Sequence, residues 1–401
     1  MENNLAKKAK IYLNILCEEI KSRPLGSPEN QFATNYFANT INSYGFDIEK
    51  NEFDCIDWEQ KGVKLYAGDE KLEAFPSPYS EGCEVIGNII SVESMEKLQH
   101  VDVSDEILLL HKDIARQRLT PKNHLFNKSG KHKKIISLLE EKSPAAIITV
   151  SNHYQKVNGK MVPYPIIEDG DFNIPSVYIS ENEVKKLLDL REERVFLQNK
   201  CERIISTGFN VIASKGKNQK NRLVLLANID TKIGSPGASN NASGITILLL
   251  LAELLKDYKK GQRIEIVAIN GGNYFSNPGG EKYLELNSNN SDNILVGIDI
   301  NKVGFKKGRS SYSLYNCPVK IGKNIRTVFD SYSNIVEKDR QQKDSHNLFL
   351  IMERPSLELS SERIKELNQL IINSEKDIPA LLSVNHLVHL AHALHELILK
   401  L

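Results

Sequence analysis

The N-terminal part of the chain combines two helical patterns with one strand pattern. Residues 5–22 carry apolar side chains at helical spacing, and Arg23–Pro28 then supplies two prolines and a glycine that end the helix. A second helix is predicted over residues 31–44, since Gly45 suits the position just after a helix. Residues 46–54 have the pattern of a strand. The apolar positions of the first helix are Leu5, Ala9, Tyr12, Leu13, Leu16 and Ile20.

From about residue 208 onward, short apolar runs alternate with helical patterns. Each run is nearly continuous, as expected for strands that are covered on both faces. The clearest intervening helix is predicted at residues 243–259, with Ser243 as its cap. This alternation predicts an α/β fold with a mostly parallel sheet flanked by helices. The apolar runs are Arg222–Ala227, Arg263–Ile269, Ile294–Ile300 and Ser356–Leu359.

The middle of the chain, residues 59–207, has a different pattern of apolar and polar residues. It contains short strand patterns, separated by a basic loop at 122–134 and a loop rich in proline and glycine at 163–175. We therefore predict a smaller β-rich domain inserted at 59–207 into a domain made of residues 1–58 and 208–401. The strand patterns lie at Val85–Ile90, Glu106–Leu110, Ala145–Val150 and Ser176–Ile179.

Composition narrows the class of protein. The 401 residues include 52 Lys and Arg against 51 Asp and Glu, so the net charge of +1 predicts no nucleic-acid partner. The longest apolar stretch, Ile245–Leu255, is about half of a bilayer span and predicts a buried helix, with no membrane span. The N-terminus has no signal-peptide pattern. Five scattered cysteines without a CxxC pair predict a reducing, cytoplasmic location.

The most specific motif begins at the end of the first C-terminal strand. Ala227-Asn228-Ile229-Asp230 is followed by Gly234-Ser235-Pro236-Gly237-Ala238-Ser239-Asn240-Asn241-Ala242-Ser243-Gly244. This segment resembles the core motif of the co-catalytic di-zinc aminopeptidases, the family that includes aminopeptidase Y, glutaminyl cyclase and the transferrin receptor. In that family the strand ends in Ala-His-x-Asp, and a Gly-Ser-Pro-Gly-rich turn leads into Asp-Asn-Ala-Ser-Gly.

Weaker matches follow in the family's order. Residues 267–274 resemble its strand ending in Gly-Glu-Glu, residues 298–304 its Asn-x-Asp-x-x-Gly strand end, and residues 373–377 its late His-Thr-x-x-Asp segment. The Arg-x-x-Gly-Ser stretch at 23–27 is also typical, and the insert resembles a protease-associated domain. The resemblance implies a zinc-exopeptidase-like fold over nearly the whole chain. It also implies a cis peptide bond at Asn240-Asn241.

In this family two zinc ions, about 3.5–4 Å apart, activate a bridging water and polarise the peptide carbonyl. One zinc binds the first His and the strand-end Asp, and the other binds the second Glu and the late His. The Asp of Asp-Asn-Ala-Ser-Gly bridges the two ions, and the first Glu is the general base. Carried over to this chain, the ligand positions hold Asn228, Asn240, Asn273, Asn301 and Asn373, and the general-base position holds Gly272.

Every one of these positions departs from the family. A neutral amide binds zinc poorly and cannot act as a general base at neutral pH, and Gly272 has no side chain. The resemblance therefore implies no metal and no other cofactor. The substitutions have a physical logic, because several inward-facing carboxylates repel one another once their metal is lost.

Some polar positions of the family survive. Asp230 matches a residue that orients the first His, although a structural hydrogen bond at the strand end is the simpler interpretation. Asp299 precedes the strand-end ligand position. Asp344 and His346, with Phe349, resemble a region that lines the pocket near the metals.

Four histidines in the C-terminal helix, at 386, 389, 392 and 395, invite a metal interpretation. A helix has 3.6 residues per turn, however, so four residues spaced three apart do not lie in one line but spread over half of its circumference. An ordinary amphipathic helix is the better interpretation.

Three hypotheses follow. The first is a catalytically inactive homologue of a zinc aminopeptidase that binds a peptide or protein in the old substrate site. The second is an active metallo-aminopeptidase that releases N-terminal amino acids with zinc held by replacement ligands. The third is a one-metal acyl transferase like glutaminyl cyclase, which needs the same missing side chains. Metal content separates the first hypothesis from the other two.

Overall fold

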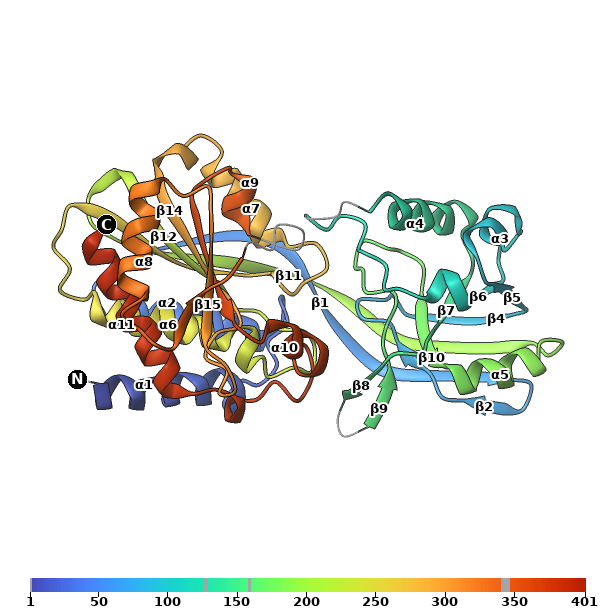
Figure 1. The fold of residues 1–401 in the computed structure, drawn as a ribbon. Coiled ribbons are helices and arrows are strands. Elements are labelled where there is room, and N and C mark those ends of the chain that lie inside the picture. Colours follow the sequence, from blue (N-terminus) through green and yellow to red (C-terminus); the bar gives the residue numbers. More distant parts are fainter. Residues whose placement is uncertain (1, 126–128, 158–159, 340–346) are drawn as a thin grey trace. The chain divides into compact units, whose positions relative to one another are not determined.

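The computed structural model describes residues 2–125, 129–157, 160–339 and 347–401 (Figure 1). The chain forms two compact units, one of Met1–Cys55 with Thr207–Leu401 and one of Ile56–Ser206. Two long strands, β1 (Asp47–Ala67) and β11 (Val195–Lys215), pass from one unit into the other.

The larger unit is built on a mixed sheet whose centre is parallel. β12 pairs in parallel with β13 and β14, and β14 pairs in parallel with β17. The order β16-β15-β17-β14-β12-β13-β11-β1-β2 adds antiparallel neighbours towards both edges, and its last strand, β2 (Glu70–Leu72), belongs to the smaller unit. The predicted α/β class with a mostly parallel core is confirmed. The strands are β12 (Asn218–Asn228), β13 (Gln262–Ile269), β14 (Ile294–Ile300), β15 (Ser310–Tyr315), β16 (Ile335–Glu337) and β17 (Ser356–Ser361).

Five helices pack on one another and bury one face of this sheet. They are α1 (Glu2–Asn14), α2 (Pro28–Asn42), α6 (Ser243–Leu254), α8 (Val319–Phe329) and α11 (Val384–Lys400). The apolar run of α6 is completely buried, which explains why it is hydrophobic all round. The described residues of this unit also form the α-helices α7 (Pro278–Asn287), α9 (Leu348–Ile351) and α10 (Ile364–Leu370) (Figure 1).

Alternation along the strands gives the two faces of the sheet different chemistry. In β14, Val296, Ile298 and Ile300 belong to the core under the five helices. Gly297 and Asp299 therefore point to the opposite face. A Cβ at Gly297 would lie 2.2 Å from the ring of Phe349, so glycine at this position lets α9 pack directly on the strand.

Three local expectations are corrected. The first predicted helix continues past α1 as a π-helix (Ile15–Glu19), and Lys21 then turns with a φ of 65°. Ser243 is not the cap of α6 but its first residue, because its φ of −61° and ψ of −46° are helical; its hydroxyl donates to the carbonyl of Ser239 at 3.1 Å. The predicted strand 85–90 is two strands in different sheets, because the backbone N–H of Asn88 donates to the carboxylate of Glu106.

The smaller unit contains a five-stranded sheet in the order β3-β10-β7-β6-β5, with parallel pairing except at β3. Two apolar cores lie in this unit. Its elements are β2 (Glu70–Leu72), β3 (Phe75–Pro76), β4 (Cys83–Gly87), β5 (Ile89–Val92), α3 (Met95–His100), β6 (Ile107–Leu110), α4 (Gly130–Lys142), β7 (Ala146–Ser151), β8 (Tyr154–Val157), β9 (Lys160–Pro163), β10 (Ser176–Ser180) and α5 (Glu181–Asp189).

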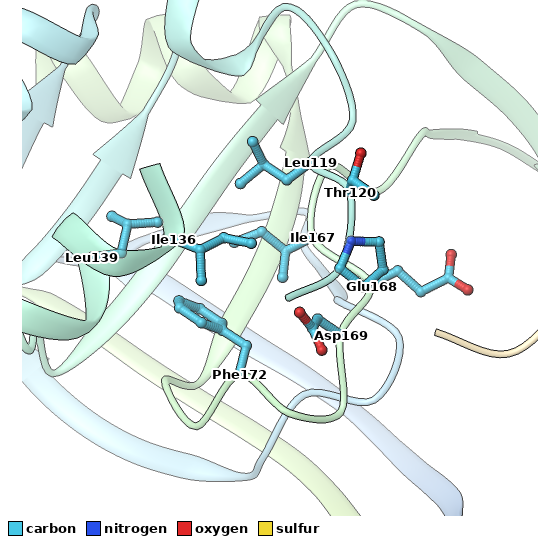
Figure 2. A pocket seen from close by; sticks show the side chains of 9 residues that line it. Leu119, Thr120, Ile136, Leu139, Ile167, Glu168, Asp169 and Phe172 are labelled. Carbon is cyan, nitrogen blue, oxygen red and sulfur yellow. The ribbon is translucent and has the colours of Figure 1, made fainter. Parts of the chain in front are cut away.

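A pocket with an empty volume of about 240 Å³, open mouth included, lies in the smaller unit beside α4 (Figure 2). Its walls are mainly apolar and include Ile136, Ile167 and Phe172. The carboxylate of Asp169 accepts backbone N–H groups of Lys122 at 2.6 Å and of Asp171 at 2.9 Å, so this polar group already has partners. In the described part of the chain, no helix combines the length and the apolar character needed to cross a membrane.

Candidate functional site

The parallel strands at the centre of the sheet bring the motif positions together at their carboxyl ends. Asn228 is the last residue of β12, Gly272 lies three residues beyond β13, and Asn301 directly follows β14. Neighbouring parallel strands end at the same edge of a sheet, which is where open α/β proteins bind their ligands. The turn after β12 and the segment before α11 supply Asn240 and Asn373.

One amide joins three of the predicted ligand positions. The side-chain Nδ2 of Asn240 donates to Oδ1 of Asn273 at 2.9 Å and to Oδ1 of Asn373 at 3.0 Å. Asn273 in turn donates from Nδ2 to the carbonyl of Asp230 at 2.8 Å. Both hydrogens of the Asn240 amide are therefore used within the site.

A second amide, that of Asn241, organises the end of β14; the sequence predicted the cis peptide bond of Asn241 but not these side-chain contacts. Nδ2 of Asn241 donates to the carbonyl of Ile300 at 2.7 Å and to Oδ1 of Asn301 at 3.0 Å. Its Oδ1 accepts the backbone N–H groups of Lys302 at 3.2 Å and Gly244 at 3.3 Å. The peptide bond between Asn240 and Asn241 is cis, as predicted.

Asp230 has structural partners in the turn that follows β13. Its buried carboxylate accepts the backbone N–H of Gly272 at 3.1 Å and that of Asn273 at 2.7 Å. Burial raises the pKa of this carboxyl, while the two backbone donors oppose the rise. The hydrogen bonds fix the turn that follows β13.

The space at Gly272 is already occupied. A Cβ built on Gly272 would lie 3.1 Å from Cβ and 3.3 Å from Cγ of Asn228. Such contacts are tighter than ordinary packing, so any side chain at 272 requires the side chain at 228 to move. The two positions are therefore coupled.

A turn built by Asp377 presents Asn240. The buried carboxylate of Asp377 accepts the N–H of Ser239 at 2.7 Å and that of Asn240 at 3.0 Å. Ser235 donates its hydroxyl to the carbonyl of Ser374 at 3.1 Å, which ties the same turn to the 373–377 segment.

Comparison with known proteins relates this geometry to a family. The model of peptidase family M28 matches residues 210–350. An aminopeptidase from Aneurinibacillus sp. strain AM-1 superposes with a TM-score of 0.72 and 18% identity, over 100% of this chain and 93% of its own. BSAP, a zinc aminopeptidase from Bacillus subtilis, gives 0.74 and 16%, over 98% and 94%. This chain has the fold of the zinc aminopeptidases.

A glutaminyl cyclase from Porphyromonas gingivalis is a more distant structural neighbour, with a TM-score of 0.51 and 13% identity over 100% of this chain and 99% of its own. Among curated proteins, none matches the sequence.

The side chains present do not fit the metal that this fold implies. Five amides stand at the predicted ligand positions, and within the described residues no three His, Cys, Asp or Glu side chains are grouped so as to hold a metal ion. The four histidines of α11 form no such group either. Asp344 and His346, the predicted pocket residues of the late loop, lie outside the described residues.

Charged groups remain beside the amides. Asp299, on the sheet face that carries Asn228, accepts Nδ2 of Asn301 at 2.6 Å. Burial, and next the nearby charge of Glu358, raises the pKa of the Asp299 carboxyl well above its usual value. Burial also lowers the pKa of the Lys302 ammonium, against the attraction of Asp299, Glu358 and Asp377.

The raised pKa of Asp299 has a consequence for stability. Above the unfolded pKa of about 3.9, the folded chain still holds a proton that the unfolded chain has released. The contribution of Asp299 to stability is therefore complete below that pH and is lost as the pH rises through the folded pKa.

We expect an Asp299→Asn variant to lose this dependence. Urea unfolding between pH 4 and pH 8 should show the variant gaining on the parent by about 1.4 kcal/mol per pH unit within the window between the two pKa values. Asp292→Asn, which changes a side chain that is 93% exposed, is the control and should leave the pH profile unchanged. Parallel profiles for Asp299→Asn and the parent would contradict the prediction.

Proposed function

We propose that this chain is a catalytically inactive relative of the zinc aminopeptidases, which binds a peptide or protein segment at the carboxyl ends of its parallel strands. The observation that carries the proposal is the closed amide network in which Asn240 donates to Asn273 and Asn373. These amides bond to one another where the family places zinc ligands. A hydrogen-bonded amide set needs no ion to hold it together.

We also propose that Ile56–Ser206 is the counterpart of a protease-associated insert. The protein works in the cytoplasm without a cofactor. The mixed strands and two cores of that unit are consistent with an independent binding module.

The first experiment measures metal content and activity together. Protein dialysed against micromolar zinc should retain well under one ion per chain by elemental analysis, and it should release no nitroaniline from aminoacyl-nitroanilides above background. A chelator should leave the melting temperature unchanged, because removing an ion that is not bound cannot shift the folding equilibrium.

Two stoichiometric zinc ions, with turnover that a chelator abolishes, would establish the active aminopeptidase with replacement ligands instead. Zinc at one ion per chain with cyclisation of N-terminal glutamine would establish the acyl transferase.

A separate measurement tests the binding part of the proposal. A library of fluorescent peptides with free N-termini should contain sequences that bind the protein, and binding should weaken in Asn373→Leu, which removes an amide from the network. Asn290→Leu is the control, because Asn290 lies in the turn before β14 and outside the network. Equal binding by the two variants would place the peptide site elsewhere.

A further inference from the structure

The orientation of the amides in the network follows from the backbone groups that they contact. Asn273 donates to the backbone carbonyl of Asp230 at 2.8 Å, so the atom on that side is its nitrogen, and its oxygen faces Asn240. Asn240 then has to present its own nitrogen to Asn273, and the same nitrogen donates to Oδ1 of Asn373 at 3.0 Å. One backbone carbonyl thus fixes the orientation of three side chains.

A second series of contacts fixes the amides at the end of β14. Asn241 donates to the carbonyl of Ile300 at 2.7 Å and accepts the backbone N–H of Lys302 at 3.2 Å, so its orientation is unambiguous. Its nitrogen also faces Oδ1 of Asn301 at 3.0 Å and Oδ1 of Asn228 at 3.4 Å. Both of these side chains therefore turn their oxygens towards Asn241.

Two side chains of the network keep nitrogen atoms without a good acceptor. An amide nitrogen carries two hydrogens. In the described part of the chain, Nδ2 of Asn373 donates to no acceptor, and Nδ2 of Asn228 has only the carbonyl of Asp230, at the long distance of 3.5 Å. Asn228 and Asn373 are both partly exposed, so their N–H groups can reach a bound ligand.

Acceptors are scarcer than donors in the same place. Oδ1 of Asn240 is the one oxygen of the ligand-position amides to which no described residue donates. The carboxylates nearby are buried, and each already accepts N–H groups; they belong to Asp230, Asp299 and Asp377. Among the described residues an ammonium group would therefore find no free counter-charge in the network, whereas a group that accepts hydrogen bonds finds spare donors.

We propose that the spare N–H groups of Asn228 and Asn373 bind a carboxylate of the peptide or protein segment that occupies the site. This inference rests on the proposed binding function and adds the chemical class of the group that is recognised. An ionised carboxylate accepts several hydrogen bonds, and such bonds are roughly twice as strong as those between neutral groups. An acidic side chain and a C-terminus both supply this chemistry.

Three fluorescent peptide libraries with free N-termini separate the two sources. The first has a fixed central Glu and an amidated C-terminus, the second has Gln and a free C-terminus, and the third has Gln and an amidated C-terminus. With the full-length protein and a chelator present, we expect the first or the second library to bind about tenfold more tightly than the third, the difference between a charged and a neutral hydrogen bond. Equal binding by all three would overturn the inference.

Asn373→Asp is the decisive variant. It keeps an oxygen that accepts the N–H of Asn240 but replaces the spare donor by a negative charge, and aspartate suits the left-handed φ of 63° at this position. This variant should lose the preference for a carboxylate. Asn290→Asp adds the same charge in an exposed turn before β14 and should keep the preference. Asn228→Asp removes the other spare donor and provides a second test if Asn373→Asp does not fold.

The outcomes separate this inference from the proposed function. If peptides bind the parent but the acidic and amide libraries bind alike, the carboxylate role is wrong and the proposed binding function stands. The same conclusion follows if the folded Asn373→Asp and Asn228→Asp proteins keep the parent's preference. If no library binds the parent, the proposed binding function fails, and the carboxylate role fails with it.

Discussion

An Arg23→Met variant should be about 3–5 kcal/mol less stable than the parent, the range expected when one partner of a buried charged network is removed. The Arg23 side chain is completely buried, and its guanidinium donates to carbonyls of five residues. They are Leu16, Lys21, Ile229, Pro236 and Gly237. Methionine fills much of the space but leaves these buried acceptors unpaired, and each unpaired acceptor is costly.

The consequence reaches the candidate site, because three of the five carbonyls, those of Ile229, Pro236 and Gly237, belong to the segment between β12 and Asn240. Arg23 also pairs its backbone with Thr231, through N–H to Oγ1 at 2.9 Å and through its carbonyl to the N–H of Thr231 at 3.2 Å. Hydrogen bonds therefore hold the N-terminal segment against the turn that carries Asn240 of the amide network.

Urea unfolding measured by circular dichroism tests this expectation. Arg23→Lys should recover only part of the loss, since three donors on a flexible stem cannot replace a planar fork of five. Arg309→Met, which breaks an exposed ion pair with Glu362, is the matched control and should cost at most about 1 kcal/mol. The single tryptophan, Trp58, lies in the smaller unit, so its fluorescence reports that unit separately. A cost below 1 kcal/mol for Arg23→Met would show that water satisfies the carbonyls.

The class of fold could be predicted because its signal is local and repeated. Runs such as residues 223–227 are apolar at every position and alternate with helices, which suits a parallel sheet covered on both sides. Element ends were less predictable. The backbone N–H of Asn88 donates to Glu106, 18 residues away, and this bond interrupts an apolar stretch. The hydroxyl of Ser243 donates to the carbonyl of Ser239 in the preceding turn. Both depend on contacts that a short window does not contain.

In the candidate site, too, the positions of residues could be predicted from the sequence, but contacts between distant segments could not. The motif spacing placed Asn228, Gly272 and Asn301 at strand ends, where the structure also has them. The hydrogen bonds of the Asn241 side chain were missed, because asparagine is the family's usual residue at that position and so marks no departure. They depend on the approach of the turn after β12 to the end of β14, which the parallel pairing of the two strands creates.

The prediction with the largest functional effect is that zinc binding and peptidase activity return only with a complete set of reversions. The set is Asn228→His, Asn240→Asp, Gly272→Glu, Asn273→Glu, Asn301→Asp and Asn373→His. We expect two zinc ions per chain in the sixfold variant and none in any single variant. Asn240→Asp alone, for example, replaces the donor to Asn273 and Asn373 by a second acceptor. Both amides then have to turn over, and Asn273 loses its bond to the carbonyl of Asp230.

Geometry decides which changes must be made together. The Cβ of a glutamate at 272 meets Asn228 at 3.1 Å, so Gly272→Glu is compatible with Asn228→His only if the side chain at 228 shifts. The matched control is the fivefold variant that keeps Gly272. It should bind zinc like the sixfold variant but hydrolyse aminoacyl-nitroanilides about 10²–10⁴ times more slowly, the usual contribution of a general base. Equal turnover with and without the glutamate would show that Gly272 does not stand at the general-base position, and two zinc ions in a single variant would refute the requirement for the complete set.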